Sequence, residues 1–407
     1  GIDLFSLTGW IPERIFFPSH TSKELKDFET PIDRAWDRLF SANSFGDCLI
    51  TVSTTRDLTE EAAEFLGLVT GHAYAVLNVF ESQNGIKLLK LKNPWSCRGW
   101  LGKYSPSDNI WRDNLLRKEL RYDPEEASKR NDGIFWIRWD DVLLYFRNIQ
   151  LSWNPKLFSY RMTTHGLWPK VQGPKNDTFN VGENPQYIIA FSRNGVLKKP
   201  TIWVMLSRHV TKQEQEGAEV KDFLTVHLVR NSAELKRLWV YPNGKGTIVQ
   251  GCYTNNPHVL VRYDVSEPDD QYISLILSQH EKTQNISYTL SCYSTQSFTL
   301  GRPKMLPFSI DSTGEWTDET AGGAIGSKNF FTNPMFALIL TEKTKLQLRC
   351  SISSQTIPSK SNEIAISLSS RFDHFLTVCS ILFQSTSSFL KTTQKISRQR
   401  RLKNALF

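Results

Sequence analysis

Two runs of strand-forming residues with a turn between them constrain the fold of this 407-residue chain more than any other feature. The first run, TGHAYAVL, covers residues 70–77, and the second, LKLKNPW, covers residues 89–95. The sequence ESQNG at residues 81–85 is rich in turn formers. This pattern predicts a β-hairpin in the first third of the chain.

The register of this hairpin decides which side chains meet. A bend at residues 82–83 places His72 directly opposite Asn93, so that an imidazole and a carboxamide share one face of the hairpin. A turn centred on residues 84–85 instead moves Asn93 two pairs away, to face Val76. The first register predicts one half of a nucleophilic site, because an amide that orients a histidine is a recurring part of such sites.

Composition and charge favour β-rich domains and argue against nucleic-acid binding. The length allows two or three domains, and 12 Trp, 12 Tyr and 24 Phe favour aromatic cores between strands. The net charge is +8, but residues 391–407 hold six basic residues and no acidic one, which leaves +2 on the remainder. We therefore expect no nucleic-acid partner. The longest strongly apolar run, around residues 375–383, is too short for a transmembrane segment.

The cysteines show neither a metal-binding nor a disulfide pattern. They are widely scattered, with no Cys-x-x-Cys and no Cys/His ligand spacing. Reduced thiols in a cytoplasmic protein are expected, with no metal site and no certain cofactor. The chain begins at Gly1 rather than at a methionine, so we expect it to be a piece of a longer protein. The six cysteines are Cys48, Cys97, Cys252, Cys292, Cys350 and Cys379.

Residues 1–155 mix helical and strand patterns, and are predicted to form one α+β, β-rich domain. Pro31 is expected to break the first helical pattern. The predicted helices cover residues 23–40, 58–68, 114–121 and 140–146, and the further predicted strands cover residues 48–52 and 134–139.

Residues 156–300 contain short alternating strands separated by turn residues, which predicts an antiparallel β-sandwich. The predicted strands are residues 186–191, 201–206, 223–228, 259–263, 272–277 and 286–293.

An internal repeat predicts a second sandwich. Trp168, followed by Asn184 and a proline, is echoed by Trp316, followed by Asn333 and a proline. The second copy, residues 301–350, lacks its later strands and is expected to be incomplete. Residues 351–407 are rich in serine and end in basic residues, so this tail is predicted to be poorly ordered.

Three motifs together resemble the second half of a calpain protease core. They are GHAY at residues 71–74, NPW at residues 93–95 and DGxFW at residues 132–136. The opening LTGWIPER, residues 7–14, and the tandem sandwiches resemble the PalB-like calpains (the calpain-seven type). The resemblance covers about residues 1–350. It implies the β-barrel-like second half of a papain-like core, followed by two antiparallel C2-like β-sandwiches, of which the second is incomplete.

The resemblance also implies roles for three residues. His72 would be the base partner of a cysteine nucleophile, Asn93 would orient the imidazole, and Trp95 would shield the bond between them from water. Papain-like enzymes place Cys, His and Asn in this order along the chain, so we expect the nucleophile upstream of Gly1. Cys48 precedes His72 but lies in a predicted strand rather than at a helix N-terminus. The chain by itself is therefore predicted to be inactive.

Calcium is implied by the resemblance, but not by the residues present. Where many calpains carry calcium-binding carboxylates in this half, the chain has Gly99 and Ile134, and only Asp132 remains. Calcium needs six to eight oxygen ligands, so no calcium site is expected in this half. Ser96 replaces the glycine that usually follows the tryptophan, and is expected to have little effect.

Together these observations predict an intracellular cysteine endopeptidase with a polypeptide substrate. The alternative is a non-catalytic calpain-like adaptor whose C2-like domains bind membrane-remodelling proteins, and a third hypothesis is lipid binding by the sandwiches. Ordinary structural readings also stay open. His72 can bond to backbone at a strand end, Asn93 can be a turn residue before proline, and Trp95 can be core. Asp269 and Asp270 are read as solvated turn residues rather than a cation site.

Overall fold

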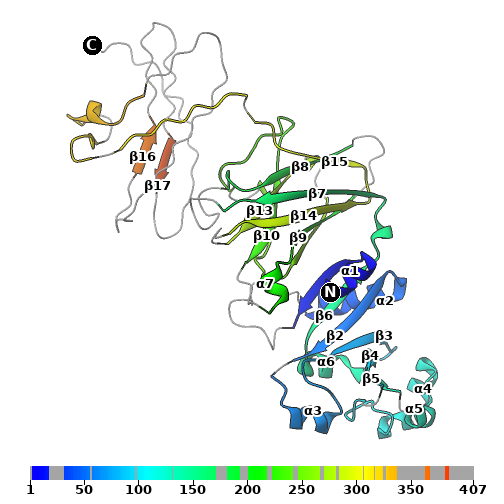
Figure 1. Ribbon diagram of the computed structural model, residues 1–407. Helices are drawn as coiled ribbons and strands as arrows, with labels where there is room; N and C mark the ends of the chain where they lie inside the picture. The colour runs from blue at the N-terminus through cyan, green and yellow to red at the C-terminus, as the bar shows by residue number, and fades with distance from the viewer. Residues whose placement is uncertain are drawn as a thin grey trace. The chain divides into compact units, whose positions relative to one another are not determined.

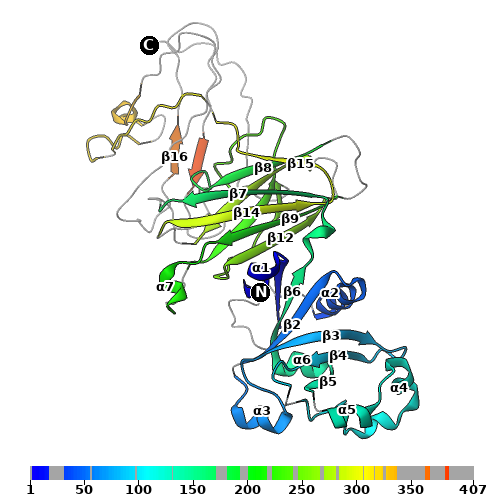
Figure 2. The same cartoon turned by 45° about the vertical axis from the view of Figure 1, so that its right-hand side comes forward.

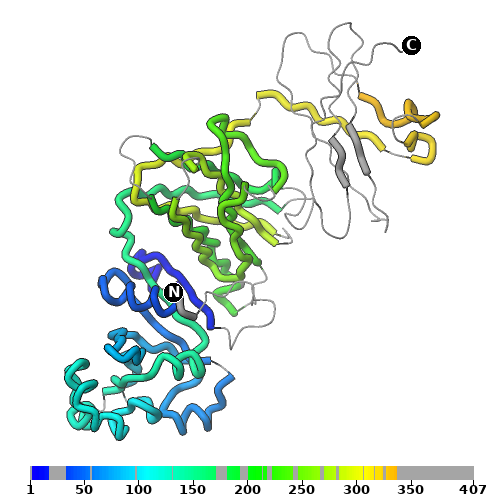
Figure 3. Tube along the Cα trace, turned by 180° about the vertical axis from the view of Figure 1, so that it is seen from behind, coloured from blue at the N-terminus to red at the C-terminus, as the bar shows by residue number. Residues whose placement is uncertain are grey.

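The computed structural model of the protein describes most of residues 2–336, and the chain divides into two units, Gly1–Lys304 and Met305–Phe407. In Figure 3 the first unit can be followed from a sheet (blue to cyan) into a sandwich (green to yellow). The described residues are 2–17, 32–55, 57–96, 99–130, 132–170, 181–192, 200–217, 222–241, 246–265, 270–280, 284–305, 307–315, 317–323, 327–336, 363–366 and 381–384.

A six-stranded antiparallel sheet forms the N-terminal part of the first unit, with strand order β1-β6-β2-β3-β4-β5 (Figure 1). Among the described residues no ladder joins β1 to β5, so the expected barrel-like half is seen as a sheet with two edges. The strands are β1 (Ile11–Phe16), β2 (Cys48–Thr54), β3 (Ala73–Glu81), β4 (Lys87–Lys92), β5 (Ile134–Arg138) and β6 (Phe146–Trp153).

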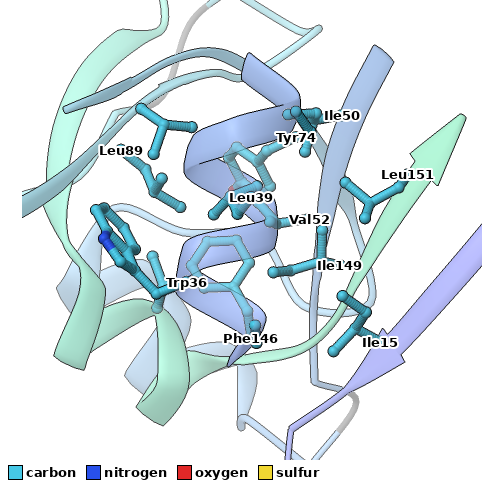
Figure 4. Close-up of a cluster of buried hydrophobic side chains, with 14 of the residues drawn as sticks. Ile15, Trp36, Leu39, Ile50, Val52, Tyr74, Leu89, Phe146, Ile149 and Leu151 are labelled. Carbon is cyan, nitrogen blue, oxygen red and sulfur yellow. The ribbon is translucent and has the colours of Figure 1, made fainter. Parts of the chain in front are cut away.

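Helix α2 (Ile32–Phe45) closes the core of this sheet (Figure 4). Its Trp36 and Leu39 are almost fully buried, and the Trp36 Nε1–H donates to Glu81 at 2.8 Å. The predicted helix over residues 23–40 is thus confirmed only in its second half, beginning directly after Pro31; residues 18–31 lie outside the described part. The sheet side chains in this core include Ile15, Ile50, Val52, Tyr74, Leu89, Phe146, Ile149 and Leu151.

The short predicted helices are confirmed as α3 (Glu60–Leu66), α4 (Asn114–Leu120) and α6 (Trp139–Tyr145). Gly67 ends α3 in the left-handed region, at φ +72°, as helix-terminating glycines do. The helices α1 (Ile2–Thr8) and α5 (Pro124–Arg130) were not predicted. None of the helices in the described part of the chain has the length and apolarity that crossing a bilayer requires.

The β3–β4 hairpin is confirmed, but both predicted registers are wrong. The Gly85 N–H donates to the Ser82 carbonyl at 2.9 Å, and Gly85 itself lies at φ +75°. Ser82 in turn donates to Ile86 at 2.9 Å, so the loop has three residues, a turn followed by a left-handed glycine. An odd loop length gives a register between the two that were predicted.

A bulge at Leu77 then shifts the hairpin register a second time. Val76 pairs with Leu91, whereas Asn78 pairs with Lys90, so Leu77 is the extra residue. The ladder ends at the next pair, before it reaches the residues of the predicted site. The site is therefore not built from directly opposed strand residues.

A β-sandwich follows the sheet, after a 3-10 turn at Pro155–Leu157. One sheet has the order β11-β10-β13-β8-β15 and the other β12-β9-β14-β7, and Figure 2 shows the second sheet broadside. Both are antiparallel, and their facing side chains form one buried cluster. The six predicted strands are confirmed, and β7, β11 and β15 are additional. The strands are β7 (Tyr160–Trp168), β8 (Gln186–Phe191), β9 (Thr201–Arg208), β10 (Leu224–Arg230), β11 (Thr247–Val249), β12 (His258–Asp264), β13 (Tyr272–Gln279), β14 (Ile286–Ser294) and β15 (Phe298–Gly301).

A buried charged cluster joins the six-stranded sheet to the sandwich. The Glu13 carboxylate accepts from Arg38 at 2.7 Å and from the Trp153 Nε1–H at 2.6 Å. Arg262 of the sandwich lies 3.0 Å from the same carboxylate, and its guanidinium stacks on Trp203. Glu13 thus connects elements that lie more than two hundred residues apart in the sequence.

His258, at the start of β12, contributes a pH dependence to this same region. Its ring packs edge-on against Phe5 at 4.7 Å, and its Nδ1 lies 2.9 Å from the Ser207 hydroxyl. Burial, with smaller effects of the N-terminal amino group and Arg208, lowers the pKa of His258 from 6.5 to about 4. The folded protein therefore favours the neutral imidazole, whereas the unfolded chain takes up a proton below about pH 6.5.

We therefore expect the free energy of unfolding to fall as the pH falls from 6.5 to 4, by at most about 1.4 kcal/mol per pH unit from this group. Urea unfolding at pH 7, 5.5 and 4.5 measures it, with His258→Gln as the comparison because glutamine keeps a polar group beside Ser207. The wild type is expected to lose more stability than the variant on acidification. Parallel pH curves would contradict the assignment.

The second unit contains little regular structure among its described residues. A 3-10 turn covers Phe330–Thr332, and two short strands, β16 (Glu363–Ile366) and β17 (Ile381–Gln384), pair antiparallel. Asn184 and Asn333 each donate their backbone N–H to the carbonyl three residues before, which is a local likeness between the two repeats. Trp316, residues 337–362 and most of the tail lie outside the described residues, so the incomplete second sandwich and the poorly ordered tail stay predictions.

Candidate active site

The candidate active site lies where β3 begins and β4 ends. His72 directly precedes β3, and Asn93 directly follows β4. The His72 Nε2 and the Asn93 Oδ1 are 3.2 Å apart; Asn93 is fully buried and His72 is half-buried. The structure thus brings these two side chains together although neither predicted register holds, because Asn93 has left the ladder and entered the turn that follows it.

The hydrogen bonds around Asn93 determine which nitrogen of His72 is free. The Trp95 backbone N–H donates to the Asn93 Oδ1 at 3.0 Å, and only the carbonyl oxygen of the amide can accept this bond. The His72 Nε2, facing the same oxygen, must therefore carry a proton. In the neutral imidazole this leaves Nδ1 unprotonated and available as a base.

The backbone of the turn directly before β5 binds the backbone of Asn93. The Asn93 N–H donates to the Gly133 carbonyl at 2.9 Å. Gly133 lies at φ +74°, and a Cβ there would sit 3.1 Å from the Asn93 carbonyl oxygen and 3.3 Å from the Asn93 Cβ. Asp132 forms the turn by accepting from the Ile134 N–H at 3.0 Å. The Asp-Gly pair of the sequence motif therefore positions the backbone of Asn93, and through it the side-chain carboxamide.

Replacing Gly133 by alanine is expected to cost about 2 kcal/mol of stability and to displace Asn93. A left-handed backbone costs a residue with a Cβ about 1–2 kcal/mol, and the close approach to Asn93 adds to this cost. Gly85→Ala is the matched control, because Gly85 has φ +75° and nothing lies within 4 Å of its Cβ position. Urea unfolding of both variants should show the larger loss for Gly133→Ala, and equal losses would contradict the close approach.

Trp95 lies against His72. Their ring centroids are 4.4 Å apart at an interplanar angle of 43°, while 58% of Trp95 is exposed. Trp95 is therefore not a core residue in this structure, and its shielding role stays a prediction. Ser96, next in the chain, lies at φ +56°, a conformation that glycine adopts freely and serine does not. The expectation that this substitution has little effect stays a prediction, and the left-handed backbone of Ser96 is the feature that opposes it.

The cysteines that the structure describes are not nucleophiles for His72. Cys48 begins β2, and burial raises the pKa of its thiol to about 12. The other end of β2, Thr54, is the residue beside His72, so Cys48 is about 20 Å away along the strand. Burial also raises the thiol pKa of Cys252 and Cys292, which belong to the sandwich. Residues 97, 350 and 379 lie outside the described part.

No metal site is built from the residues that the structure describes. Nowhere among them do three or more His, Cys, Asp or Glu side chains gather in a metal-binding arrangement. At the positions expected for calcium, Gly99 and Ile134 offer no side-chain oxygen, and Asp132 is engaged in its turn. These residues do not fit a calcium site.

The reading of Asp270 as a solvated turn residue is wrong. Its carboxylate is fully buried, 2.5 Å from the Arg230 guanidinium, and it accepts from the Tyr263 hydroxyl. Burial of a carboxylate requires such partners, so Asp270 has a structural role within the sandwich. Residue 269 lies outside the described part.

Sequence reasoning missed two contributors to the site, Gly133 as the support of Asn93 and Thr54 as a partner of the His72 backbone. An Asp-Gly pair before a strand signals a turn, but not which side chain the turn supports. Nothing in the sequence marks Thr54. An imidazole whose Nε2 proton is held by a buried amide resembles the base arrangement of papain-like cysteine peptidases, and this is the class of protein that the sheet and site indicate.

Comparison with known proteins agrees with this class. Residues 4–152 match the family described as "Calpain family cysteine protease". The chain is 38% identical over 326 residues to Calpain-7 of Homo sapiens, covering 79% of this chain and 38% of that protein. It is 30% identical over 364 residues to the calpain-like protease palB/cpr-8 of Neurospora crassa, covering 86% of this chain and 36% of that protein.

The predicted resemblance to the calpain family of cysteine proteases, and to its PalB-like members, is confirmed, with the family match itself confined to residues 4–152. A further relative is the calpain-like protease palB of Emericella nidulans, 28% identical over 355 residues that cover 86% of this chain and 37% of that protein. The chain thus spans less than two fifths of the length of each of these relatives.

Proposed function

We propose that this chain is the base-bearing part of a calpain-like cysteine endopeptidase. His72 acts as general base and acid, Asn93 orients its ring, and Trp95 covers the bond between them. The nucleophilic cysteine and the oxyanion donors come from polypeptide upstream of Gly1, and the substrate is a polypeptide. The observation that carries the proposal is the bond from His72 Nε2 to the buried Asn93 amide, which leaves Nδ1 free.

The chemistry follows from this geometry. The free Nδ1 takes the proton of the approaching thiol, and the resulting imidazolium stabilises the thiolate that attacks the peptide carbonyl. The imidazolium then gives the proton to the leaving amine, which requires that the ring has not turned between the two steps. The Asn93 amide holds the ring without adding a charge, because a carboxamide is neutral. Trp95 keeps water from competing for the His72–Asn93 bond.

The remaining domains support this core. We assign residues 156–300 to a first C2-like sandwich, 301–350 to a partial second one, and 351–407 to a tail, after a half-core at residues 1–155. The two antiparallel sheets with a shared core favour the first assignment. These domains position the core or dock membrane-remodelling proteins in the cytoplasm. If the core were inactive in the full protein, the chain would be the non-catalytic adaptor.

The test is a comparison of this chain alone with the same chain joined to its upstream polypeptide. The joined protein is expected to cleave a fluorogenic peptide and to lose the activity when the upstream cysteine is changed to alanine. The chain alone is expected to be inactive, since no described thiol lies near His72. Absence of cleavage by a folded joined protein would overturn the proposal and favour the adaptor.

A further inference from the structure

We infer that Thr54 is a positioning residue that fixes the backbone of His72 and so aims its imidazole; this rests on the proposed function for its catalytic meaning. Thr54 ends β2 and is 3% exposed. Its N–H donates to the His72 carbonyl at 3.0 Å, and its hydroxyl oxygen accepts from the His72 N–H at 2.9 Å. Both peptide groups of His72 are therefore bound to one residue.

The Thr54 hydroxyl is also a hydrogen-bond donor. It donates to the Val69 carbonyl at 2.6 Å, a shorter contact than the 3.2 Å to the His72 carbonyl. The Val69 N–H in turn donates to the Tyr74 hydroxyl at 2.9 Å. The turn before His72 is thus held on the Val69 side by Thr54 and Tyr74, and on the His72 side by Thr54.

This clamp acts directly after a conformationally permissive residue, whose N–H donates to the Thr55 carbonyl at 3.4 Å. The preceding residue, Gly71, lies at φ +58° and has no Cβ to restrict it. The pairing of β2 with β6 shifts register between Ser53 and Thr54, and Thr54, paired with Phe146, is the last residue of that ladder. A base must stay within a fraction of an ångström of its productive position, so a backbone hinge one residue away would otherwise move Nδ1.

The Thr54 bonds to the His72 backbone also affect the orientation of the imidazole ring. The ring is tied at Nε2 to Asn93, while its Cα is tied through Thr54. Loss of the Thr54 hydroxyl releases the His72 N–H and leaves only the bond from the Thr54 N–H to the His72 carbonyl at the Cα end. The His72 backbone then moves more, so the bond to Asn93 lengthens or breaks intermittently. The imidazole then exchanges between its two tautomers instead of keeping the Nε2–H form.

The experiment is long-range proton–nitrogen NMR of the 407-residue chain with labelled histidine, with His72 assigned by the signal lost in His72→Gln. Wild type, Thr54→Ser and the matched control Thr51→Val, which makes the same change three residues away on β2, are expected to show one Nε2–H tautomer. Thr54→Val is expected to show a mixture. A wild-type tautomer signal in Thr54→Val, or a mixture in Thr54→Ser, would overturn the inference.

A measurement on the wild type covers the case in which Thr54→Val does not fold. The His72 backbone amide is expected to exchange with solvent roughly a hundredfold more slowly than a free amide, since its bond opens only in local unfolding. Free exchange at His72 would overturn the inference without any variant. In the joined protein, Thr54→Val should lower kcat about tenfold or more with KM unchanged. A joined protein that does not cleave refutes the proposed function, but leaves the NMR result on Thr54 standing.

Discussion

A joined protein carrying His72→Ala is expected to cleave a fluorogenic peptide at least about a thousandfold more slowly than wild type, judged by kcat/KM. Without the imidazole the thiol is not deprotonated near neutral pH, and no group returns a proton to the leaving amine. The loss should fall on kcat rather than KM, because the imidazole acts on the reacting atoms. The observation behind this expectation is the free Nδ1 left by the bond to Asn93.

The matched control for His72→Ala is His165→Ala, which removes an imidazole from the sandwich strand β7. His165 bonds only to the Thr289 hydroxyl among the described contacts, so its loss should leave cleavage within about twofold of wild type. Circular dichroism and urea unfolding would show that both variants are folded. Undiminished cleavage by His72→Ala would refute the role assigned to this histidine.

The largest expected effect on stability is that of Glu13→Ala, at about 3 kcal/mol. The Glu13 carboxylate holds Arg38 and Arg262 at 2.7 and 3.0 Å and accepts from the Trp153 indole. Its removal leaves two partly buried guanidinium groups without their anion, and unpaired buried charges are costly. Urea unfolding at pH 7 measures the loss.

Glu126→Ala is the matched control for Glu13, because it removes an equivalent Glu–Arg pair from the surface. Glu126 and Arg130 are each 60% exposed, so this change should cost less than about 0.5 kcal/mol. A double-mutant cycle of Glu13→Ala with Arg262→Ala then isolates the contact between the sheet and the sandwich. Equal losses for Glu13→Ala and Glu126→Ala would show that the buried cluster does not stabilise the first unit.

The strands of the sandwich could be predicted from the sequence because alternation between apolar and polar residues is a local signal. Residues 186–191 are predicted and observed with identical bounds. The added strand β7 was missed because its side chains are mostly exposed, which removes the apolar alternation that marks a strand. The described part of α2 begins directly after Pro31, where the sequence predicts a break in the helical pattern.

The hairpin register could not be predicted, because it depends on single residues that the strand pattern does not reveal. One left-handed glycine in the loop and one bulged residue, Leu77, each shift the pairing by one. Asn93 nevertheless reaches His72, because the turn after β4 is held by the Gly133 backbone rather than by the ladder. The correct pair was thus predicted from an incorrect register.

By itself the sequence determined which residue types meet at the site. The histidine stands in one motif and the asparagine and tryptophan in another, and the hairpin between the two motifs brings them together. The tertiary structure alone decided which imidazole nitrogen is free, that Thr54 clamps His72, that Cys48 lies at the far end of its strand, and that Glu13 ties the sheet to the sandwich. The physical reason is that motifs are encoded over a few neighbouring residues. Hydrogen-bond direction, burial and ion pairing depend on groups that folding brings from distant parts of the chain.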